Sequence, residues 1–395
     1  MAEIDDALPN QSVSDEEFVE KEVVEIETPT EDVVETSEDI EVMMDDEGGA
    51  EVSFDPTTPP EEGEDHFSNL AEYLDDGVLD PLGSNLYDKY TDYKESRADW
   101  EQSYREGLGL LGFKYERRTE PFRGASGVNH PVLAEAVTQF QAQAYKELLP
   151  ADGPVRTQIL GKITPEKQDQ SHRVKDFMNY QIMDQMKEYE PEFDQMLFYL
   201  PLSGSTFKKV YYDDLLGRAV SKFVPADDLI VPYSANSLDD AEAIVHVIKI
   251  SENELRKQQV AGFYRDIELG TPPVTENQLE DKKLELEGIS KDGQEDQYTL
   301  LEMHVDLDIE GYEDVGEDGE PTGIKLPYIV TIAESNNKIL SIRRNFAIED
   351  PTKKKINYFV QFKFLPGTGF YGFGLIHMIG GLTRTATAAL RQLLD

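Results

Sequence analysis

The sequence predicts an α+β fold in which a helical N-terminal part precedes antiparallel meander sheets, and a long helix begins at the end. Apolar residues recur every three or four positions up to about residue 200 and again after residue 374. Between them, over much of 205–364, apolar and polar residues alternate. Short turns join most of these alternating segments, and strands joined by short turns pair antiparallel because parallel pairing needs a long crossover.

The first 80 residues differ in composition from the rest. Residues 1–80 carry 29 Asp and Glu against a single basic residue, Lys21, and so account for −28 of the formal net charge of −43. Their short apolar pairs are separated by acids, so little apolar surface could be buried to offset the entropy of the chain. We therefore expect a disordered acidic tail over 1–80, an α+β domain over 81–366, and a glycine turn with a helix over 367–395.

Each element follows from local spacing. Expected helices, in chain order, cover 85–111, 131–149, 164–186, 193–200 and 251–263. Expected strands cover 205–213, 218–224, 228–232, 243–250, 298–309, 326–334, 338–345 and 358–364. The polar stretch of about 270–295 is expected to be a flexible excursion. In the second helix one apolar face is expected to contain Val132, Ala136, Phe140, Ala144 and Leu148.

Several classes of protein lack support in the sequence. The chain has no cysteine, which rules out disulfides, thiolate zinc sites and cysteine nucleophiles. It contains no G-x-x-x-x-G-K-[ST], H-E-x-x-H or G-x-S-x-G motif, so we do not expect an enzyme. No apolar run approaches the roughly 20 residues of a membrane span. Residues 81–395 hold 51 acidic and 36 basic residues, a balance that opposes tight binding to a phosphate backbone.

A glycine-rich turn precedes the last helix. Gly367, Gly369 and Gly372 match G-x-G-x-x-G, and Gly374 follows. A dinucleotide-binding turn belongs to a parallel βαβ unit, whereas this one follows an antiparallel meander, so we expect no cofactor. We expect these glycines to turn the chain from the sheet into the helix.

An acidic segment resembles a calcium loop. Asp306, Asp308, Glu310 and Glu317 occupy positions one, three, five and twelve of that pattern, with Gly311 at position six. The flanking segments are expected strands, whereas this type of calcium loop lies between two helices. The sequence thus favours a solvated acidic hairpin loop, with calcium binding as the alternative.

The last helix carries two stripes. Leu375, Ile379, Leu382, Ala386, Leu390 and Leu393 recur with gaps of four and three, as in helices that pack on partners. His377, Arg384 and Arg391 repeat every seven residues on another face. The pattern leaves two interpretations open: an ordinary core helix, or a helix that packs between subunits.

Three blocks of sequence resemble the portal proteins of tailed bacteriophages, particularly those with short tails. They are RGASGVNHPVLAEAVTQFQAQAYKELLPADGPVRTQILG, LLEMHVDLDIEG and FLPGTGFYGFGLIHMIGGLTRTATAALRQLLD, in this order. The resemblance implies a ring, dodecameric in the virion, at one vertex of the capsid, assembled in the host cytoplasm, through which double-stranded DNA enters and leaves. It implies that 81–366 forms the wing and 367–395 begins a stem helix.

The resemblance also implies partners and site residues. The partners would be a separate terminase ATPase, the major capsid and scaffolding proteins, and tail adaptor proteins. Arg384, Arg391, His377 and Thr387 would line the channel or a subunit interface. A complete portal continues beyond the stem helix, so we expect 1–395 to be a fragment or one piece of a split protein. The alternatives are another capsid or tail structural protein without a DNA channel, or a calcium-binding protein.

Overall fold

The computed structural model describes residues 41–44, 50–53, 66–113, 118–120, 122–213, 216–272, 277–289, 297–316, 320–367 and 369–395. The chain divides into two units, Met1–Gly63 and Glu64–Asp395. In the first unit β1 (Glu41–Met44) pairs antiparallel with β2 (Ala50–Ser53). Most of the predicted acidic tail lies outside the described residues.

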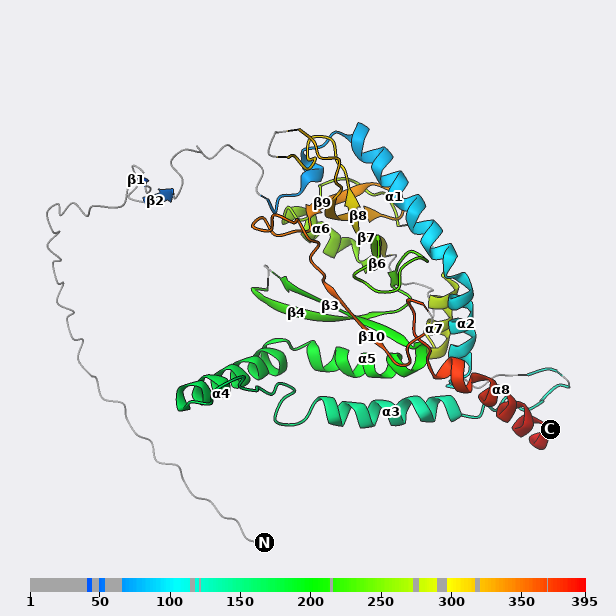
Figure 1. Ribbon diagram of the computed structural model, residues 1–395. Coiled ribbons are helices and arrows are strands. Elements are labelled where there is room, and N and C mark those ends of the chain that lie inside the picture. The colour runs from blue at the N-terminus through cyan, green and yellow to red at the C-terminus, as the bar shows by residue number, and fades with distance from the viewer. Residues whose placement is uncertain are drawn as a thin grey trace, which may run out of the picture. The chain divides into compact units, whose positions relative to one another are not determined.

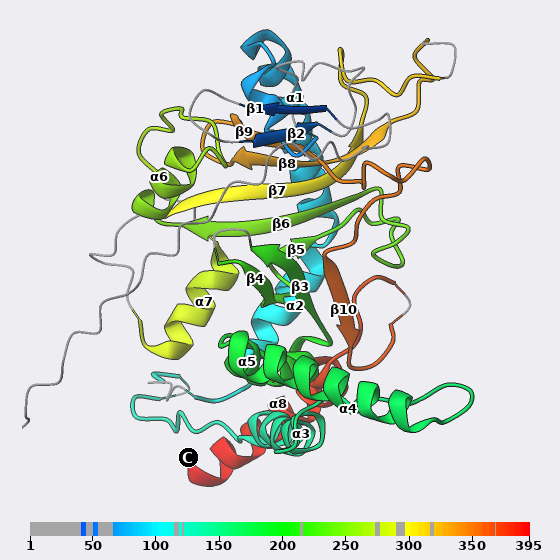
Figure 2. The same cartoon turned by 90° about the vertical axis from the view of Figure 1, so that its left-hand side faces the viewer.

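The second unit stacks two sheets on a layer of helices, as Figures 1 and 2 show. The larger sheet has the order β5-β6-β7-β8-β9 and the smaller one β10-β3-β4. The strands are β3 (Ser205–Asp213), β4 (Arg218–Pro225), β5 (Leu229–Ile230), β6 (Ala243–Ile250), β7 (Tyr298–Leu307), β8 (Leu326–Ala333), β9 (Ile339–Arg344) and β10 (Phe359–Lys363). Every pairing within these two sheets is antiparallel, which confirms the predicted α+β class.

The helices differ in how deeply they pack. They are α1 (Asp76–Ser96), α2 (Ala98–Gly109), α3 (Val132–Leu148), α4 (Pro165–Tyr180), α5 (Tyr189–Ser203), α6 (Glu252–Val260), α7 (Gln278–Glu287) and α8 (Leu375–Leu394). Helices α1 and α2 run along one side of both sheets, and α3 and α5 lie beneath the smaller sheet (Figure 1). No helix in the described part of the chain is long and apolar enough to cross a membrane.

The packed unit begins earlier than predicted. Leu70 and Ala71, in a short 3₁₀ helix (Leu70–Glu72), are fully buried with Leu79 of α1 in the core against the larger sheet. Asn69 fixes this segment, because its side chain donates to the Leu340 carbonyl and accepts from the Ile342 amide. The boundary at residue 80 was therefore wrong: the acids of 66–80 face outward around buried apolar residues.

Two further predictions differ from the structure. The excursion at 270–295 contains α7, which Asn277 caps and whose Leu279 is buried among the helices. In α3 the fully buried residues are Leu133, Ala134 and Val137. The predicted residues Val132, Ala136, Phe140 and Ala144 are half-buried and Leu148 is exposed, so the prediction placed the core face beside the buried one. Thr164 and Ser251, in contrast, cap α4 and α6 as their sequences predict.

A buried charge cluster joins the two sheets. Lys209 on β3 lies 2.6 Å from both carboxylate oxygens of Glu302 on β7, and His304 donates to Glu302 at 2.9 Å. His246, opposite Glu302 on β6, has a buried Nδ1 with no hydrogen-bond partner. Desolvation lowers the pKa of His246 to about 3, although Glu302 opposes this shift, and the charges of Lys209, His304 and Lys222 add to it.

His246 should make folding sensitive to mild acid. The pKa of His246 is lower in the folded than in the unfolded chain. The free energy of unfolding therefore keeps its full value above about pH 6.5 and falls by up to about 1.4 kcal/mol per pH unit as the pH drops toward 3. We expect His246→Phe to lose less stability than the wild type between pH 7 and pH 5, measured by denaturant unfolding at each pH. His172→Gln, exposed on α4, should keep the wild-type pH dependence. An unchanged slope in His246→Phe would contradict the assignment.

Candidate functional site

The glycine turn packs against backbone at the end of α5. A Cβ atom at Gly372 would lie 2.6 Å from the Gly204 carbonyl oxygen, and one at Gly374 would lie 2.3 Å from that of Leu202. The Gly372 amide donates to the Ser205 hydroxyl at 2.7 Å. These glycines therefore let β10 turn into α8 in contact with the α5–β3 junction, as predicted. Gly367 is equally crowded, by the Tyr371 carbonyl, whereas the space beside Gly369 is open.

His377 acts at the start of α8. Its Nδ1 accepts from the Gly374 amide at 3.1 Å, which satisfies a donor that the first turn of a helix leaves without a partner. Desolvation lowers the pKa of His377, and the neutral imidazole is the form that can accept this bond. The structure thus gives His377 a capping role, and its role in a channel or interface stays a prediction.

The loop before α3 runs along the C-terminal half of α8. Arg391 donates to the Val128 carbonyl at 2.8 Å and to the Asn129 side chain, and the Thr387 hydroxyl accepts from the His130 amide at 3.0 Å. Arg384 pairs with Glu106 of α2 at 3.3 Å, where both side chains are at least half exposed. Of the predicted residues, Arg391 and Thr387 hold the loop and are half-buried, whereas Arg384 and His377 are exposed.

A cavity of about 480 Å³ lies beside this loop, lined by the last turn of α2 and the second half of α8. Arg118, Arg384 and Arg391 line it together with Glu106 and Asp395. Helix α2 has its C-terminal end here, and guanidinium groups offset the partial negative charge of such an end. The arginines therefore have an electrostatic role within the chain.

Helix α8 changes from buried to exposed along its length. Its first half packs in the core through Ile376 and Gly380, and Ile376 lies so close to Gly107 of α2 that a Cβ there would be 2.4 Å away. Leu382 and Leu393, from the predicted apolar stripe, are 69% and 84% exposed. The first half of α8 therefore fits the interpretation of an ordinary core helix, and packing of its exposed second half between subunits stays a prediction.

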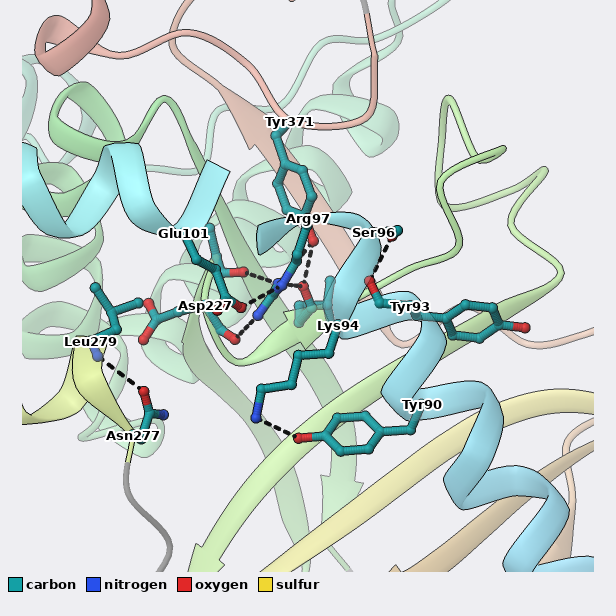
Figure 3. Close-up of polar contacts among 12 residues, drawn as sticks. Tyr90, Tyr93, Lys94, Ser96, Arg97, Glu101, Asp227, Asn277, Leu279 and Tyr371 are labelled. Carbon is teal, nitrogen blue, oxygen red and sulfur yellow. Dashed lines mark hydrogen bonds and ion pairs between the residues drawn. The ribbon is translucent and has the colours of Figure 1, made fainter. Parts of the chain in front are cut away.

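A buried arginine connects the base of α8, the segment at its N-terminal end that includes Tyr371, to the rest of the unit. Arg97 lies at the junction of α1 and α2 and is only 6% exposed. Its guanidinium donates to the Ala226 and Leu229 carbonyls at 3.0 and 2.9 Å, and to the Asp227 carbonyl (Figure 3). It also donates to the Tyr371 hydroxyl at 2.9 Å, next to the glycine turn. This Arg97 hub connects three segments that are distant in sequence: the α1–α2 junction, residues 226–229 and Tyr371.

An acidic side chain and stacked aromatic rings also pack around the Arg97 hub. Glu101, one helical turn after Arg97, accepts from its Nε at 2.8 Å. Trp100 stacks on Tyr371 with ring centroids 4.7 Å apart, and on Tyr104 at 5.4 Å. Trp100 is partly buried and packs α2 against two groups of buried apolar residues. The importance of Arg97 was missed, although a charged residue spaced with Tyr93, Trp100 and Tyr104 on an apolar stripe was a usable signal.

Two acids of the turn before β5 sit beside the hub. Asp227 pairs with Lys283 of α7 at 2.6 Å. Burial, with the neighbouring charge of Asp227, raises the pKa of Asp228 to about 7. Tyr104, which lies close enough to be affected by both acids, has a buried hydroxyl without a hydrogen-bond partner. This polar cluster holds α7 against α2 and β5.

The spacing of the acids in 306–310 follows the in-out alternation of β7 and the residues directly after it. Val305, Leu307 and Ile309 are buried, whereas Asp306 and Asp308 between them are exposed, as strand alternation requires. Glu310 continues the exposed series, and Glu317 lies outside the described residues. No group of three or more metal-binding side chains occurs in the described ranges. Alternation explains the spacing without a cation.

Comparisons with known proteins add no identification. No family model matches the chain, and no curated protein matches it.

We expect Arg97→Met to destabilise the unit by about 3–5 kcal/mol, because it leaves Glu101 and several buried carbonyls without their donor. Arg97→Lys should recover only part of this, since an ammonium lacks the fork that reaches several acceptors. Denaturant unfolding measures the loss, and hydrogen exchange should show faster opening in the first turn of α8. Arg256→Met, which breaks an exposed pair, is the control. Equal losses of unfolding free energy in Arg97→Met and Arg256→Met would contradict the stabilising role of the Arg97 hub.

Asp228→Asn should stabilise the protein at alkaline pH. A carboxyl whose folded pKa is raised costs stability as pH rises from its unfolded value of about 4 through about 7. We expect the variant to gain at least about 1 kcal/mol at pH 8 and almost nothing at pH 4. The measurement is thermal or denaturant unfolding at both pH values, with Asp169→Asn on the exposed side of α4 as control. A gain that is the same at both pH values would contradict this.

Proposed function

We propose that the chain is a structural subunit of a phage-type portal, the ring at one capsid vertex through which double-stranded DNA is packaged and released. The observation that carries the proposal is the arrangement of α8. Its base is fixed by the glycine turn and the Arg97 hub, and its second half presents apolar side chains to solvent. Such a helix is suited to packing against neighbouring subunits.

The three blocks that resemble portal proteins support the proposal by their placement. The first block supplies the loop at 126–130 and α3, and the third supplies the glycine turn and α8. These two blocks contact each other through Arg391, Thr387 and Asp395, whose side chain accepts from the Ser126 amide at 2.5 Å. Two of the three blocks that carry the resemblance thus build one substructure, whereas the second lies mostly in β7.

The acidic net charge of the chain also supports a role as a conduit for DNA. Strong contacts between basic side chains and phosphates would hold a duplex in place, whereas an acidic body lets it slide. With no P-loop in the sequence, the energy for packaging would come from a separate terminase ATPase, and the chain itself would catalyse no reaction. Capsid, scaffolding and tail adaptor proteins are the other partners that we propose, in a virion.

Electron microscopy of the full-length protein tests the proposal. We expect closed rings with a central hole wide enough for duplex DNA, since a contact between two different faces of a subunit closes into a ring when the rotation permits. Closed particles without a hole would favour another capsid or tail component, and a monomer or an open filament would contradict the portal. Arg384→Glu, on the exposed side of α8, should reduce the fraction of closed rings or the amount of DNA packaged, because the resemblance implies that Arg384 lines the channel or a subunit interface.

A further inference from the structure

The cavity beside the loop at 126–130 is lined by one face of α8 and the last turn of α2, which ends next to α8 (Figure 1). On α8 the lining residues recur with helical spacing, at Arg384, Thr387, Ala388 and Arg391. Gly109 of α2 and Ala388 add little side-chain volume, so the space of about 480 Å³ between them stays open. A volume of this size is typical of pockets that hold a small molecule.

Two arginines of this cavity have hydrogen-bond donors that the chain does not use. A guanidinium group has five N–H donors. Arg118 makes one long bond, at 3.4 Å to the Ser126 carbonyl, and Arg384 makes one, at 3.3 Å to the Glu106 carboxylate. Within the part of the chain that the structure describes, the other donors of Arg118 and Arg384 have no partner. They can therefore bind a molecule that enters the cavity.

The opposite is true of Arg391 and Thr387, which are fixed. Arg391 is half-buried and bonds the Val128 carbonyl and the Asn129 side chain, so its positive charge has a set position. The Thr387 hydroxyl accepts from the His130 amide and keeps its own proton to donate. The cavity thus combines a fixed charge with two adaptable guanidinium groups.

The carboxylates that line the cavity already have partners. Glu106 accepts from Gln102 at 3.3 Å and from Arg384, and the Asp395 side chain accepts from the Ser126 amide at 2.5 Å. Three guanidinium groups face these two carboxylates and the end of α2, which carries about half a negative charge. Positive charge and unused donors are both in excess, so the cavity favours an anion.

The arrangement fits a phosphate better than a carboxylate. A phosphate monoester carries nearly two negative charges at neutral pH and three terminal oxygens, which accept from donors on several sides. A carboxylate carries one charge and two oxygens in a plane. Arg118 comes from the loop and Arg384 and Arg391 from α8, so the donors approach from two segments. Leu110 and Gly109 leave an apolar wall for the organic part of the ligand.

We propose that this cavity binds the phosphate group of a small phosphate monoester. Arg118 and Arg384 donate to its oxygens, and Arg391 supplies the fixed positive charge. The inference goes beyond the proposed function and does not depend on it, because it rests on the lining of the cavity alone.

Isothermal titration calorimetry of the full-length protein with glycerol 1-phosphate tests the site, at low and constant ionic strength because salt screens exposed charges. We expect one saturable site per chain. Arg118→Met and Arg384→Met should each weaken binding by about tenfold or more, since each removes a charge-assisted contact. Arg173→Met, exposed on α4, is the matched control and should bind as the wild type does. Glycerate, which carries a carboxylate in place of the phosphate, should bind about tenfold more weakly or worse.

Two further variants separate loss of binding from loss of structure. Glu106→Gln removes the carboxylate that competes for Arg384, so binding should tighten by about threefold or more, which a misfolded protein could not show. Ala388→Met fills the cavity without changing its charge and should abolish binding. Its circular dichroism melt should stay close to wild type, because residue 388 is exposed.

Three results would overturn the proposal. They are the absence of saturable glycerol 1-phosphate binding below about 10 mM, binding that Arg118→Met and Arg384→Met leave unchanged, and binding of a short DNA duplex, but not of glycerol 1-phosphate, that both variants weaken. Failure of the site and failure of the portal are distinguishable. Closed rings that bind no glycerol 1-phosphate would refute the site and leave the portal in place, whereas a monomer that binds it would refute the portal and leave the site in place.

Discussion

Arg97 is a buried cation whose charge the fold must balance, and the position of α8 depends on how it does so. Desolvating a guanidinium costs several kcal/mol unless its donors find acceptors. Here the acceptors are carbonyls of the turn before β5, the Glu101 carboxylate and the Tyr371 hydroxyl. Because the Tyr371 hydroxyl donates a hydrogen bond to the Leu229 carbonyl, the start of α8 is fixed by the same network. Few alternative arrangements could satisfy every donor.

The hub also explains why α8 can be exposed further along. Its base needs no contribution from the C-terminal half, since Tyr371, the glycine turn and the Ile376–Gly107 contact already hold it. Leu382 and Leu393 can then face solvent without loss of the local structure. This division between a fixed base and an exposed, apolar remainder is what an interface helix needs, because association then costs little further ordering.

Local features of the fold could be predicted from the sequence, whereas its long-range pairings could not. Caps such as Thr164 act through bonds to the next few residues, and strand alternation reports burial of one face, so both are visible locally. The pairing of β10 with β3 joins residues about 150 positions apart, and no local pattern encodes it. The helix in 270–295 was missed because its burial depends on Leu279 and on Lys283 finding Asp227.

The candidate site shows the same limit. The sequence indicated a turn at Gly372 and a stripe with Arg384 and Arg391, but the loop at 126–130 that Arg391 holds is about 260 residues away in the chain. In α4 the apolar residues Val174, Phe177 and Met178 recur with helical spacing, and such periodicity states only that a face is apolar. The structure adds that Ser171 and Asn179 occupy the inner side of α4, so the apolar side faces outward. Helices α4 and α8 each present an apolar face that has the spacing of a core helix and lies in solvent, at opposite ends of one helical layer. Such a face is one that a second molecule would cover.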